Sequence, residues 1–498
     1  NDSGNTGTSI QIPYYKVIAD NEDMTIQPRL FTNNDIILQN EYRKIGKNYD
    51  HISDFSFYTS AFSDANQTSK SHFFSNTKFQ FEDGIFEEHN IEINFEQVAN
   101  DTYLKKYKIN SPLIKSDTLM HSFVEFSGYN DDSSIVLSTE VYEDLTKRTS
   151  DRYEIVLPNI NYSKDLKKNF DLKGSLNFQS DFFQKQFETN KYEQVLNNSI
   201  LYSSPKRFDN NGLVKNFQLS LLNPNKSTKT GSSNESQSKN QVLSQFMYNL
   251  SYPLSKQSEY YNSFITPNLS YRFSPNKTKN MSDSDRRLDI SNINSFNRIS
   301  ENDAVEAGHS ITAGFGYKRN DKFGDEKISL EIAQVISDTV NDDLPIKSSL
   351  NKKYSDLIGN FNFKISDILK LDYDFMLDDG LSTSNYNSIK TTFSVNNFIT
   401  TFEYLEESDI IGSSHYVGNE TTFKLNNSNS FAFKTRSNRE IDMTEFYNLM
   451  YQYENDCLRA ALEYNKTFYA DSDIKPEEEL LFSLTIMPFS KISSTNLK

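Results

Sequence analysis

The sequence is poor in the residues and runs that mark the commonest protein classes. It has no tryptophan and one cysteine, and it has only 16 glycines and 12 prolines in 498 residues. Hydrophobic residues make up 36% of the chain, and the mean hydropathy is −0.67. No stretch approaches the run of about 18 apolar residues that a membrane-spanning helix needs. Helical membrane spans are therefore excluded, and the long apolar runs of a large soluble core are missing too.

The groups on which enzymes and nucleic-acid binders depend are sparse as well. The formal charge of −16 weighs against a nucleic-acid partner, because nucleic-acid binders carry basic patches. None of the six histidines lies three or four residues from another, and HExxH, CxxC and GxSxG motifs are absent. We expect no enzyme activity, no cofactor and no metal site; an enzyme stays an alternative that no motif supports.

Two features concern what lies outside the chain. Residues 1–4 lack the basic and apolar regions of a signal peptide, so we expect a mature protein or a fragment. Cys457 has no partner for an internal disulfide. It is either inert or bonded to a group beyond this chain.

Aromatic residues in strict alternation are what the sequence does have. There are 38 phenylalanines and 29 tyrosines, and asparagine, serine and aspartate are dense between them. Residues 169–179 alternate apolar and polar without exception, and residues 91–96 do the same. Hairpins follow the rule around turns at 366–368 and 426–430. A period of two predicts β-strands with one apolar face and one wet face.

This pattern predicts a large, all-β, antiparallel transmembrane barrel. Its charged faces need water and its many apolar faces need lipid, and a closed membrane barrel satisfies both. The length suggests about 24–26 strands. We expect short periplasmic turns and long extracellular loops, the longest at 223–240 and at 274–306. A soluble sandwich or a β-solenoid stays open on alternation alone, although no fixed repeat favours the solenoid.

Short motifs in order along the chain resemble one family of such barrels. IPYY at 12–15, DMTIQPR at 23–29 and NEYR at 40–43 look like the first strands of lipopolysaccharide-assembly proteins of the LptD family. Segments typical of its alphaproteobacterial branch follow. They are NDTYLKKY at 100–107, RYEIVLP at 152–158 and the stretch 292–308 with Asn297-Arg298 and Val305-Glu306. The final strands of the family are matched by residues 451–464 and 480–486.

The resemblance implies a function and a set of partners. Members form a kidney-shaped barrel of about 26 strands that inserts lipopolysaccharide into the outer leaflet of a Gram-negative outer membrane. An LptE-like lipoprotein plugs the lumen, and a periplasmic β-jellyroll receives lipid from the Lpt bridge. We therefore expect residues 1–8 to end the connection from a missing jellyroll, 9–490 to form the barrel in contact with outer-membrane lipid, and 491–498 to be a tail.

Two prolines suggest a gate in this barrel. Pro13 and Pro28 fall in the first two expected strands, and a proline cannot donate to a β-ladder. Each missing bond is worth only about 0.5–1.5 kcal/mol in water, but more in lipid. With the resemblance, this predicts a lateral gate between strand one (about 9–18) and the last strand (about 480–487). The alternative is that these prolines only start strands or mark bulges. The residues assigned to the gate are Pro13, Tyr14, Tyr15, Pro28, Phe482 and Leu484.

The same resemblance implies that Cys457 pairs with a cysteine of the N-terminal domain, although an inert thiol stays open. Two other functions compete with lipopolysaccharide assembly. A general outer-membrane diffusion channel or another barrel transporter would need an open lumen and an intact seam. A secreted adhesive β-protein would be soluble without detergent.

Overall fold

The computed structural model describes all residues except 1, 4–5, 33, 61–69, 83, 148–150, 167–172, 189, 231–235, 409–413, 469–475 and 487–498. The described part contains thirty strands, one short α-helix, α1 (Tyr103–Tyr107), and one 3-10 turn, η1 (Ile346–Ser348). The tail predicted at 491–498 and the first residues of the 169–179 alternation lie outside it. No helix among the described residues is long and apolar enough to cross a membrane.

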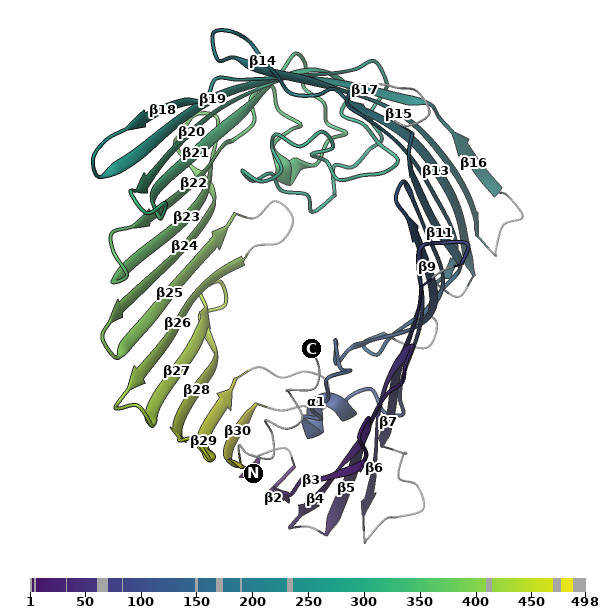
Figure 1. Cartoon of the computed structure of the whole chain (residues 1–498), viewed down its shortest axis with the longest axis vertical. Coiled ribbons are helices and arrows are strands. Elements are labelled where there is room, and N and C mark those ends of the chain that lie inside the picture. The colour runs from purple at the N-terminus through teal and green to yellow at the C-terminus, as the bar shows by residue number, and fades with distance from the viewer. Residues whose placement is uncertain are drawn as a thin grey trace. The chain divides into compact units, whose positions relative to one another are not determined.

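The chain divides into two compact units, and each is built from strands that pair with their neighbours in sequence (Figure 1). The first unit comprises residues 1–201, 222–242 and 470–475. Its strands are β1 (Asp2–Ser3), β2 (Ser9–Gln11), β3 (Tyr14–Ala19), β4 (Glu22–Phe31), β5 (Asp35–Ile45), β6 (Tyr49–Ser60), β7 (Ser71–Glu82), β8 (Glu88–Val98), β9 (Leu119–Asn130), β10 (Ser133–Asp144), β11 (Tyr153–Asp165), β12 (Ser175–Phe187), most of β13 (Lys191–Ser203), the later part of β15 (Val214–Thr230) and β16 (Ser236–Asn240).

The second unit comprises residues 202–221, 243–469 and 476–498. Besides the start of β15 it holds β14 (Arg207–Phe208), β17 (Leu243–Ser251), β18 (Leu254–Gln257), β19 (Tyr261–Ser274), β20 (Gly308–Asp321), β21 (Glu326–Ser337), β22 (Leu357–Lys364), β23 (Leu369–Leu377), β24 (Ser384–Val395), β25 (Phe398–Glu407), β26 (Ser414–Lys424), β27 (Asn429–Asn438), β28 (Met443–Glu454), β29 (Leu458–Thr467) and β30 (Glu477–Ile486). The described strands pair antiparallel, as between β19 and β20 or β28 and β29. The all-β, antiparallel prediction is confirmed.

Connections are short at one edge of each unit and long at the other. In the first unit, residues 46–48 and 131–132 form tight turns, whereas residues 99–118 form a long insertion that carries α1. In the second unit, residues 322–325 and 396–397 are short, and residues 275–307 and 338–356 are long. The loop predicted at 274–306 is therefore confirmed.

The other predicted loop was wrong. Residues 223–240 mostly extend β15 and form β16, and the two strands pair from Asn225 with Asn240 to Lys229 with Ser236. The segment is polar on both faces, so it lacks the alternation of apolar and polar residues that predicts the other strands. Backbone hydrogen bonds hold the two strands of this hairpin together, and such bonds leave no trace in the sequence.

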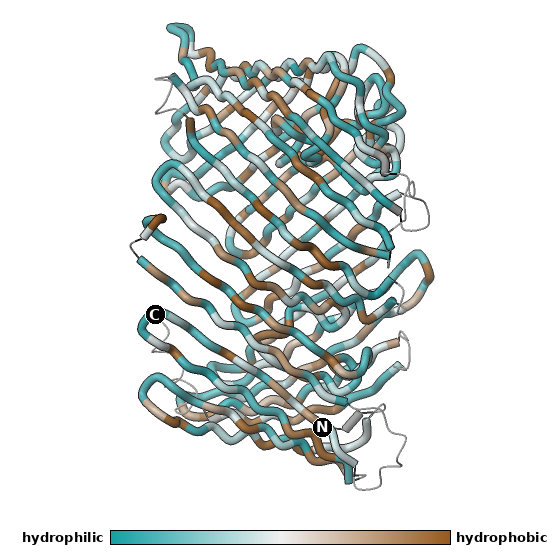
Figure 2. Tube along the Cα trace, turned by 90° about the vertical axis from the view of Figure 1, so that its right-hand side faces the viewer, coloured by the Kyte–Doolittle hydropathy of each residue, from teal (hydrophilic) through white to brown (hydrophobic). Residues whose placement is uncertain are grey.

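Burial is inverted relative to a soluble protein. On β6, Asp54 and Ser56 are 0% and 2% exposed, whereas Phe55 and Phe57 are 40% and 45% exposed. The same inversion recurs on β8 and β20. Figure 2 shows the result as brown and teal alternating along the strands. Exposed aromatic and aliphatic faces suit a strand whose outer solvent is lipid.

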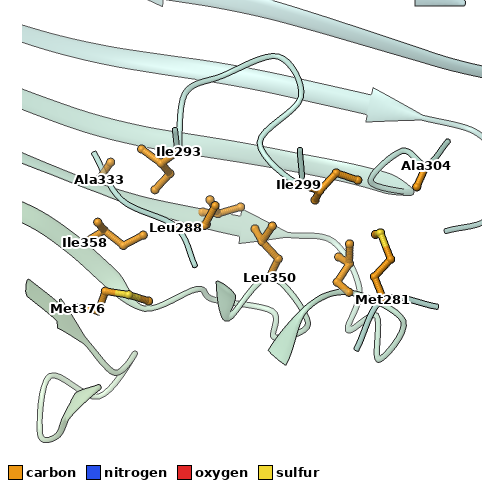
Figure 3. Packing of buried hydrophobic residues seen from close by; sticks show 11 residues of the cluster. Met281, Leu288, Ile293, Ile299, Ala304, Ala333, Leu350, Ile358 and Met376 are labelled. Carbon is orange, nitrogen blue, oxygen red and sulfur yellow. The ribbon is translucent and has the colours of Figure 1, made fainter. Parts of the chain in front are cut away.

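The long connections of the second unit fold onto its strands. Residues 275–307 and 338–356 contribute one side of a buried apolar cluster, and strands β21 to β23 contribute the other (Figure 3). Burying these side chains drives the two polar loops to pack instead of extending into solvent. The members of the cluster are Met281, Leu288, Ile293, Ile299, Ala304, Ala333, Val335, Leu344, Leu350, Ile358 and Met376.

Candidate functional site

Strand one is broken at its proline. β2 ends at Gln11 and β3 begins at Tyr14, so Ile12 and Pro13 lie between two pieces of one strand. Both pieces keep the same register against β4, with Gln11 opposite Arg29 and Tyr14 opposite Ile26. The interruption is therefore a local loss of ladder bonding and not a change of pairing.

The pattern of backbone hydrogen bonds shows which neighbouring strand loses a hydrogen bond at each proline. The Ile12 N–H donates to the Pro28 carbonyl at 3.2 Å, and the Thr32 N–H donates to the Thr8 carbonyl at 3.0 Å. In an antiparallel pair, such opposed residues exchange both bonds, and the residues between them point to the other side. The backbone N–H and C=O of Ile12 therefore point to β4, and Pro28 has no N–H to donate to the Ile12 carbonyl. The backbone nitrogen of Pro13 points to the opposite edge of strand one.

The two prolines thus act at different places. Pro28 lies inside β4 and removes one bond between β4 and strand one, because its partner there is Ile12. Pro13 removes one donor from the edge of strand one that points away from β4. Only Pro13 affects the edge of strand one that points away from β4.

The side chains around Pro13 form an exposed apolar row. Ile10, Ile12 and Tyr14 lie on one face of strand one, and all three are more than half exposed. Tyr15 points to the other face and is half-buried. The first hairpin therefore brings together four predicted gate residues: Pro13, Tyr14, Tyr15 and Pro28.

The remaining gate residues lie on β30. Phe482 and Leu484 share one face of that strand with Leu480, and all three are exposed. β30 pairs with β29 in unbroken register from Thr467 opposite Glu477 to Leu458 opposite Ile486. It belongs to the second unit, so its pairing with strand one stays a prediction.

Cys457 lies at the tip of a tight turn. The turn joins β28 to β29, and the Cys457 N–H donates to Asn455 Oδ1 at 2.9 Å. The thiol is free and exposed. This placement leaves it accessible to a second chain segment, so the predicted disulfide stays a prediction.

The insertion 99–118 is fastened to the strands of the first unit. Tyr103, Leu104 and Tyr107 of α1 are buried in an apolar cluster with side chains of β4, β5 and β7. Polar bonds add to this contact. Arg29 donates to the Tyr107 carbonyl at 2.5 Å, and Gln39 donates to the Asn110 carbonyl at 2.9 Å.

The same insertion rests on a buried polar chain. The Tyr103 hydroxyl lies 2.7 Å from Ser56 Oγ, which lies 2.7 Å from His72 Nδ1. His72 Nε2 in turn lies 3.2 Å from Asp54, and both side chains are completely buried. Burial raises the pKa of Tyr103 to about 12, so its hydroxyl stays protonated. Ser56, His72 and Asp54 therefore act as a support for α1.

A charged cluster holds the loop 275–307 of the second unit. Arg298 donates to both carboxylate oxygens of Glu306 and, at 2.9 Å, to Thr312 on β20. Arg272 on β19 lies 3.6 Å from Glu306 and donates to the Ser295 carbonyl at 2.5 Å. All three charged groups are at most 5% exposed. Two arginines share one carboxylate, which anchors the loop at both ends.

The carboxylate is held in its charged form. Burial raises the pKa of Glu306, but Arg298 and Arg272 and the bonds from Arg298 and Ser310 outweigh it. The pKa of Glu306 is therefore lowered from its ordinary 4.5 to about 2. An ionised Glu306 keeps the loop fastened over the whole physiological range.

Sequence reasoning missed these two anchors as functional groups. The segments that carry them, residues 100–107 and 292–308, stand out in the sequence only through their resemblance to the family. The Arg298–Glu306 pair gave no clear signal, because Glu301 and Asp303 lie between them and offer the arginine equally plausible partners. Arg29, next to Pro28, gave no separate signal.

Several solved outer-membrane receptors match the fold. The FrpB iron transporter from Neisseria meningitidis (F3-3 variant) is 8% identical, over 94% of this chain and 82% of that one, with a TM-score of 0.41. The alcaligin receptor FauA from Bordetella pertussis is 7% identical, over 96% and 74%, with a TM-score of 0.34. The siderophore receptor PiuA from Acinetobacter baumannii is 8% identical, over 96% and 81%, with a TM-score of 0.32.

The family assignment comes from the sequence itself. A comparison with curated protein sequences gives no significant match. A family model described as "LptD: LPS transport system D" matches residues 68–435, well over half of the chain. The chain belongs to the LptD family.

Membership in LptD confirms the resemblance and the fold class, a large outer-membrane β-barrel. It also confirms the outer membrane of a Gram-negative bacterium as the location, and lipopolysaccharide transport there as the process. The match covers both anchored insertions, at 99–118 and 275–307. The first hairpin, Cys457 and β30 lie outside the matched residues, so the match does not test the predicted gate.

Proposed function

We propose that this LptD protein inserts lipopolysaccharide into the outer leaflet through a lateral gate at strand one. One observation carries the proposal. The backbone nitrogen of Pro13 points to the edge of strand one that lies away from β4. That edge therefore lacks one hydrogen-bond donor. In lipid no water replaces a missing backbone hydrogen bond, so the missing donor weakens a seam at this edge.

The exposed apolar rows on strand one and β30 suit the lipid part of the substrate. Ile10, Ile12 and Tyr14 on one strand, and Phe482 and Leu484 on the other, offer apolar surface to acyl chains. The sugars would pass through the polar interior, where each strand of the barrel turns its hydrophilic face. Acyl chains would then leave sideways between the two strands.

Two partners belong to this proposal. An LptE-like lipoprotein would occupy the lumen, and the periplasmic Lpt bridge would deliver substrate through an N-terminal jellyroll. The exposed thiol of Cys457 would join the barrel to that domain through a disulfide. Mass spectrometry of the full-length protein under non-reducing conditions should recover a disulfide-linked peptide that contains Cys457; a free thiol there would remove this part of the proposal.

Photo-crosslinking tests the gate directly. A photoreactive residue at Tyr15, in the full-length protein in living cells, should trap lipopolysaccharide. The matched control is Phe363 on β22, which lies on the face opposite Asn362 and far along the chain from the first hairpin. An adduct at Tyr15 and none at Phe363 supports the gate. A folded, inserted protein that gives no adduct at Tyr15 contradicts it.

A general diffusion channel is the second candidate. Such a channel would need an open lumen. The loop 275–307 is instead packed onto the strands by a buried apolar cluster and by Arg298. Single-channel conductance in planar bilayers distinguishes the two functions. A large, steady conductance from the full-length protein would favour the channel.

A further inference from the structure

A basic segment stands out in this acidic protein. Four lysines and one aspartate lie between residues 103 and 118, although the whole chain carries a formal charge of −16. The lysines are Lys105, Lys106, Lys108 and Lys115. The substrate class of LptD is an anionic glycolipid, and the net charge of the chain gives no account of where its negative groups are received.

Three of these lysines line one hollow of about 550 Å³. Lys105 and Lys108 come from α1 and its C-terminal end, and Lys115 comes from the return of the insertion. We call this space the lysine hollow. Its remaining lining is mostly apolar, with one carboxylate: Leu104, Ile109, Ile114, Ser116 and Asp117.

Helix stabilisation accounts for only part of the cluster. Lysines in the last turn of a helix interact favourably with its carbonyl end, and Lys105 and Lys106 occupy that turn. Lys115 lies seven residues beyond the helix cap at Lys108, so the helix gives no reason for its charge. Lys108 and Lys115 are both exposed at the hollow.

The hollow is rigid on its inner side. Tyr103 and Tyr107 are buried, and bonds from Ser56 to Tyr103 and from Arg29 to the Tyr107 carbonyl fix the helix between them. A fixed backbone reduces the entropy that binding must overcome. Leu104, Ile109 and Ile114 make part of the lining apolar, and a less polar surrounding strengthens the attraction between opposite charges.

The hollow also connects to strand one. Arg29 Nη1 donates to the Tyr107 carbonyl, and its Nε donates to Ser9 on β2 at 3.0 Å. One side chain therefore joins the insertion to the strand that carries Pro13. A ligand held in the hollow would lie beside the proposed gate.

We propose that the lysine hollow binds the phosphate groups of the lipopolysaccharide and presents the molecule to strand one. Lysine is a common point-charge partner of phosphate. The proposal rests on the proposed function and names the residues that receive the anionic part of the substrate. Lys105, Lys108 and Lys115 are the ligands, and Arg29 is a positioning residue.

A triple variant tests the hollow. Lys105→Gln, Lys108→Gln and Lys115→Gln are combined in the full-length protein, reconstituted in lipid nanodiscs, and binding of fluorescent lipopolysaccharide is measured. We expect an affinity at least about tenfold weaker, the loss of roughly one charge-assisted contact. The corresponding triple lysine-to-arginine variant should restore binding. A triple variant that binds as tightly as the parent overturns the proposal.

A matched control removes the same charge elsewhere. Lys47, Lys78 and Lys164 lie in the first unit toward the edge that carries the short turns, and their glutamine variants should bind normally. Equal weakening in the control would mean a general charge effect and would overturn the proposal. A thermal unfolding midpoint equal to that of the parent establishes that each variant is folded.

Two further probes identify the ligand. Dephosphorylated lipopolysaccharide should bind the parent and the triple variant equally weakly; tight binding to the parent would overturn the proposal. Inorganic phosphate that displaces lipopolysaccharide only at high concentration supports a lipid-borne phosphate, and equal affinity for both would overturn that source. The Tyr15 crosslink separates the two proposals. If the triple variant binds lipopolysaccharide as tightly as the parent and still gives the Tyr15 adduct, the role of the hollow is refuted and the gate is supported.

Discussion

Glu306 is the residue on which the loop 275–307 depends most. Its single carboxylate pairs with both Arg298 and Arg272, and all three side chains are buried. Removing one member of a buried ionic group leaves uncompensated charge, which costs about 3–5 kcal/mol. Glu306→Gln should therefore release the loop, and trypsin should cleave at Arg286 or Arg287 far faster than in the parent.

The matched control is an exposed pair. Lys390 and Glu403 face each other across β24 and β25, and both side chains are about half exposed. Glu403→Gln should change the free energy of unfolding by less than about 1 kcal/mol and leave the loop uncut. Equal protease resistance in Glu306→Gln and the parent would contradict the role assigned to the cluster.

The pH dependence of the loop follows from the same residue. The pKa of Glu306 is lowered to about 2 in the folded protein, from an ordinary value of 4.5. The stabilisation is complete above the higher value and is lost as the pH falls toward the lower one. Pepsin should spare residues 275–307 near pH 4 and cut them as the pH approaches 2, and Glu306→Gln should abolish that difference. Cutting of the parent near pH 4 would contradict the lowered pKa.

At the scale of single residues, the sequence predicted what breaks a regular pattern. Pro13 and Pro28 were identifiable because proline removes a donor wherever it stands. Which neighbouring strand loses a hydrogen bond at each proline depends on the register of strand one against β4, and the structure is needed to determine that register. Arg29 and Ser56 make contacts with residues 78 and 47 positions away in sequence, so no local pattern indicates their roles.

The first hairpin separates the two prolines by experiment. Pro28→Val supplies an N–H opposite the Ile12 carbonyl and should stabilise the pairing of β2 with β4 by about 0.5–1.5 kcal/mol. Hydrogen–deuterium exchange in peptides covering β2 and β4 should slow accordingly.

Pro13→Val is the control for this hairpin. Its new N–H points to the other edge, so the exchange of β4 amides should stay as in the parent. If both variants slow exchange in β4 equally, the assigned hydrogen-bond phase is wrong.

At the scale of elements, strands with one apolar face were predictable and polar ones were not. The hairpin β22–β23 and the turn between β26 and β27 lie where alternation places them. β15 and β16 pair through serine, threonine and lysine, and the sequence gives them the composition of a loop. The short helix α1 was missed too, because five residues hold too few turns for a helical period.

For the whole molecule, the inverted burial predicts an asymmetric response to charge. Phe402 on β25 is more than half exposed on the face that meets lipid, and Thr401 points to the opposite face with Glu403. Phe402→Lys should cost about 2–4 kcal/mol if the site lies near the bilayer midplane. Urea titration of the protein in lipid measures this cost.

Thr401→Lys is the neighbouring control, and it should cost less than about 1 kcal/mol. Similar costs for both substitutions would mean that the two faces meet the same solvent. The sequence could predict this two-sided architecture because alternation covers most of the chain. It could not predict how the polar insertions fold back, since their contacts depend on strands that are distant in sequence.

The two insertions differ in when they can dock during biogenesis. Three polar anchors of the insertion 99–118, Arg29, Gln39 and Ser56, come earlier in the chain, 47 to 78 residues before their partners. The loop 275–307 instead relies largely on strands that come later, through Thr312, Ala333, Ile358 and Met376. If strands are added in order from the N-terminus, the first insertion docks on a surface already built. The second must wait, so it closes over its half of the molecule as a late step of assembly.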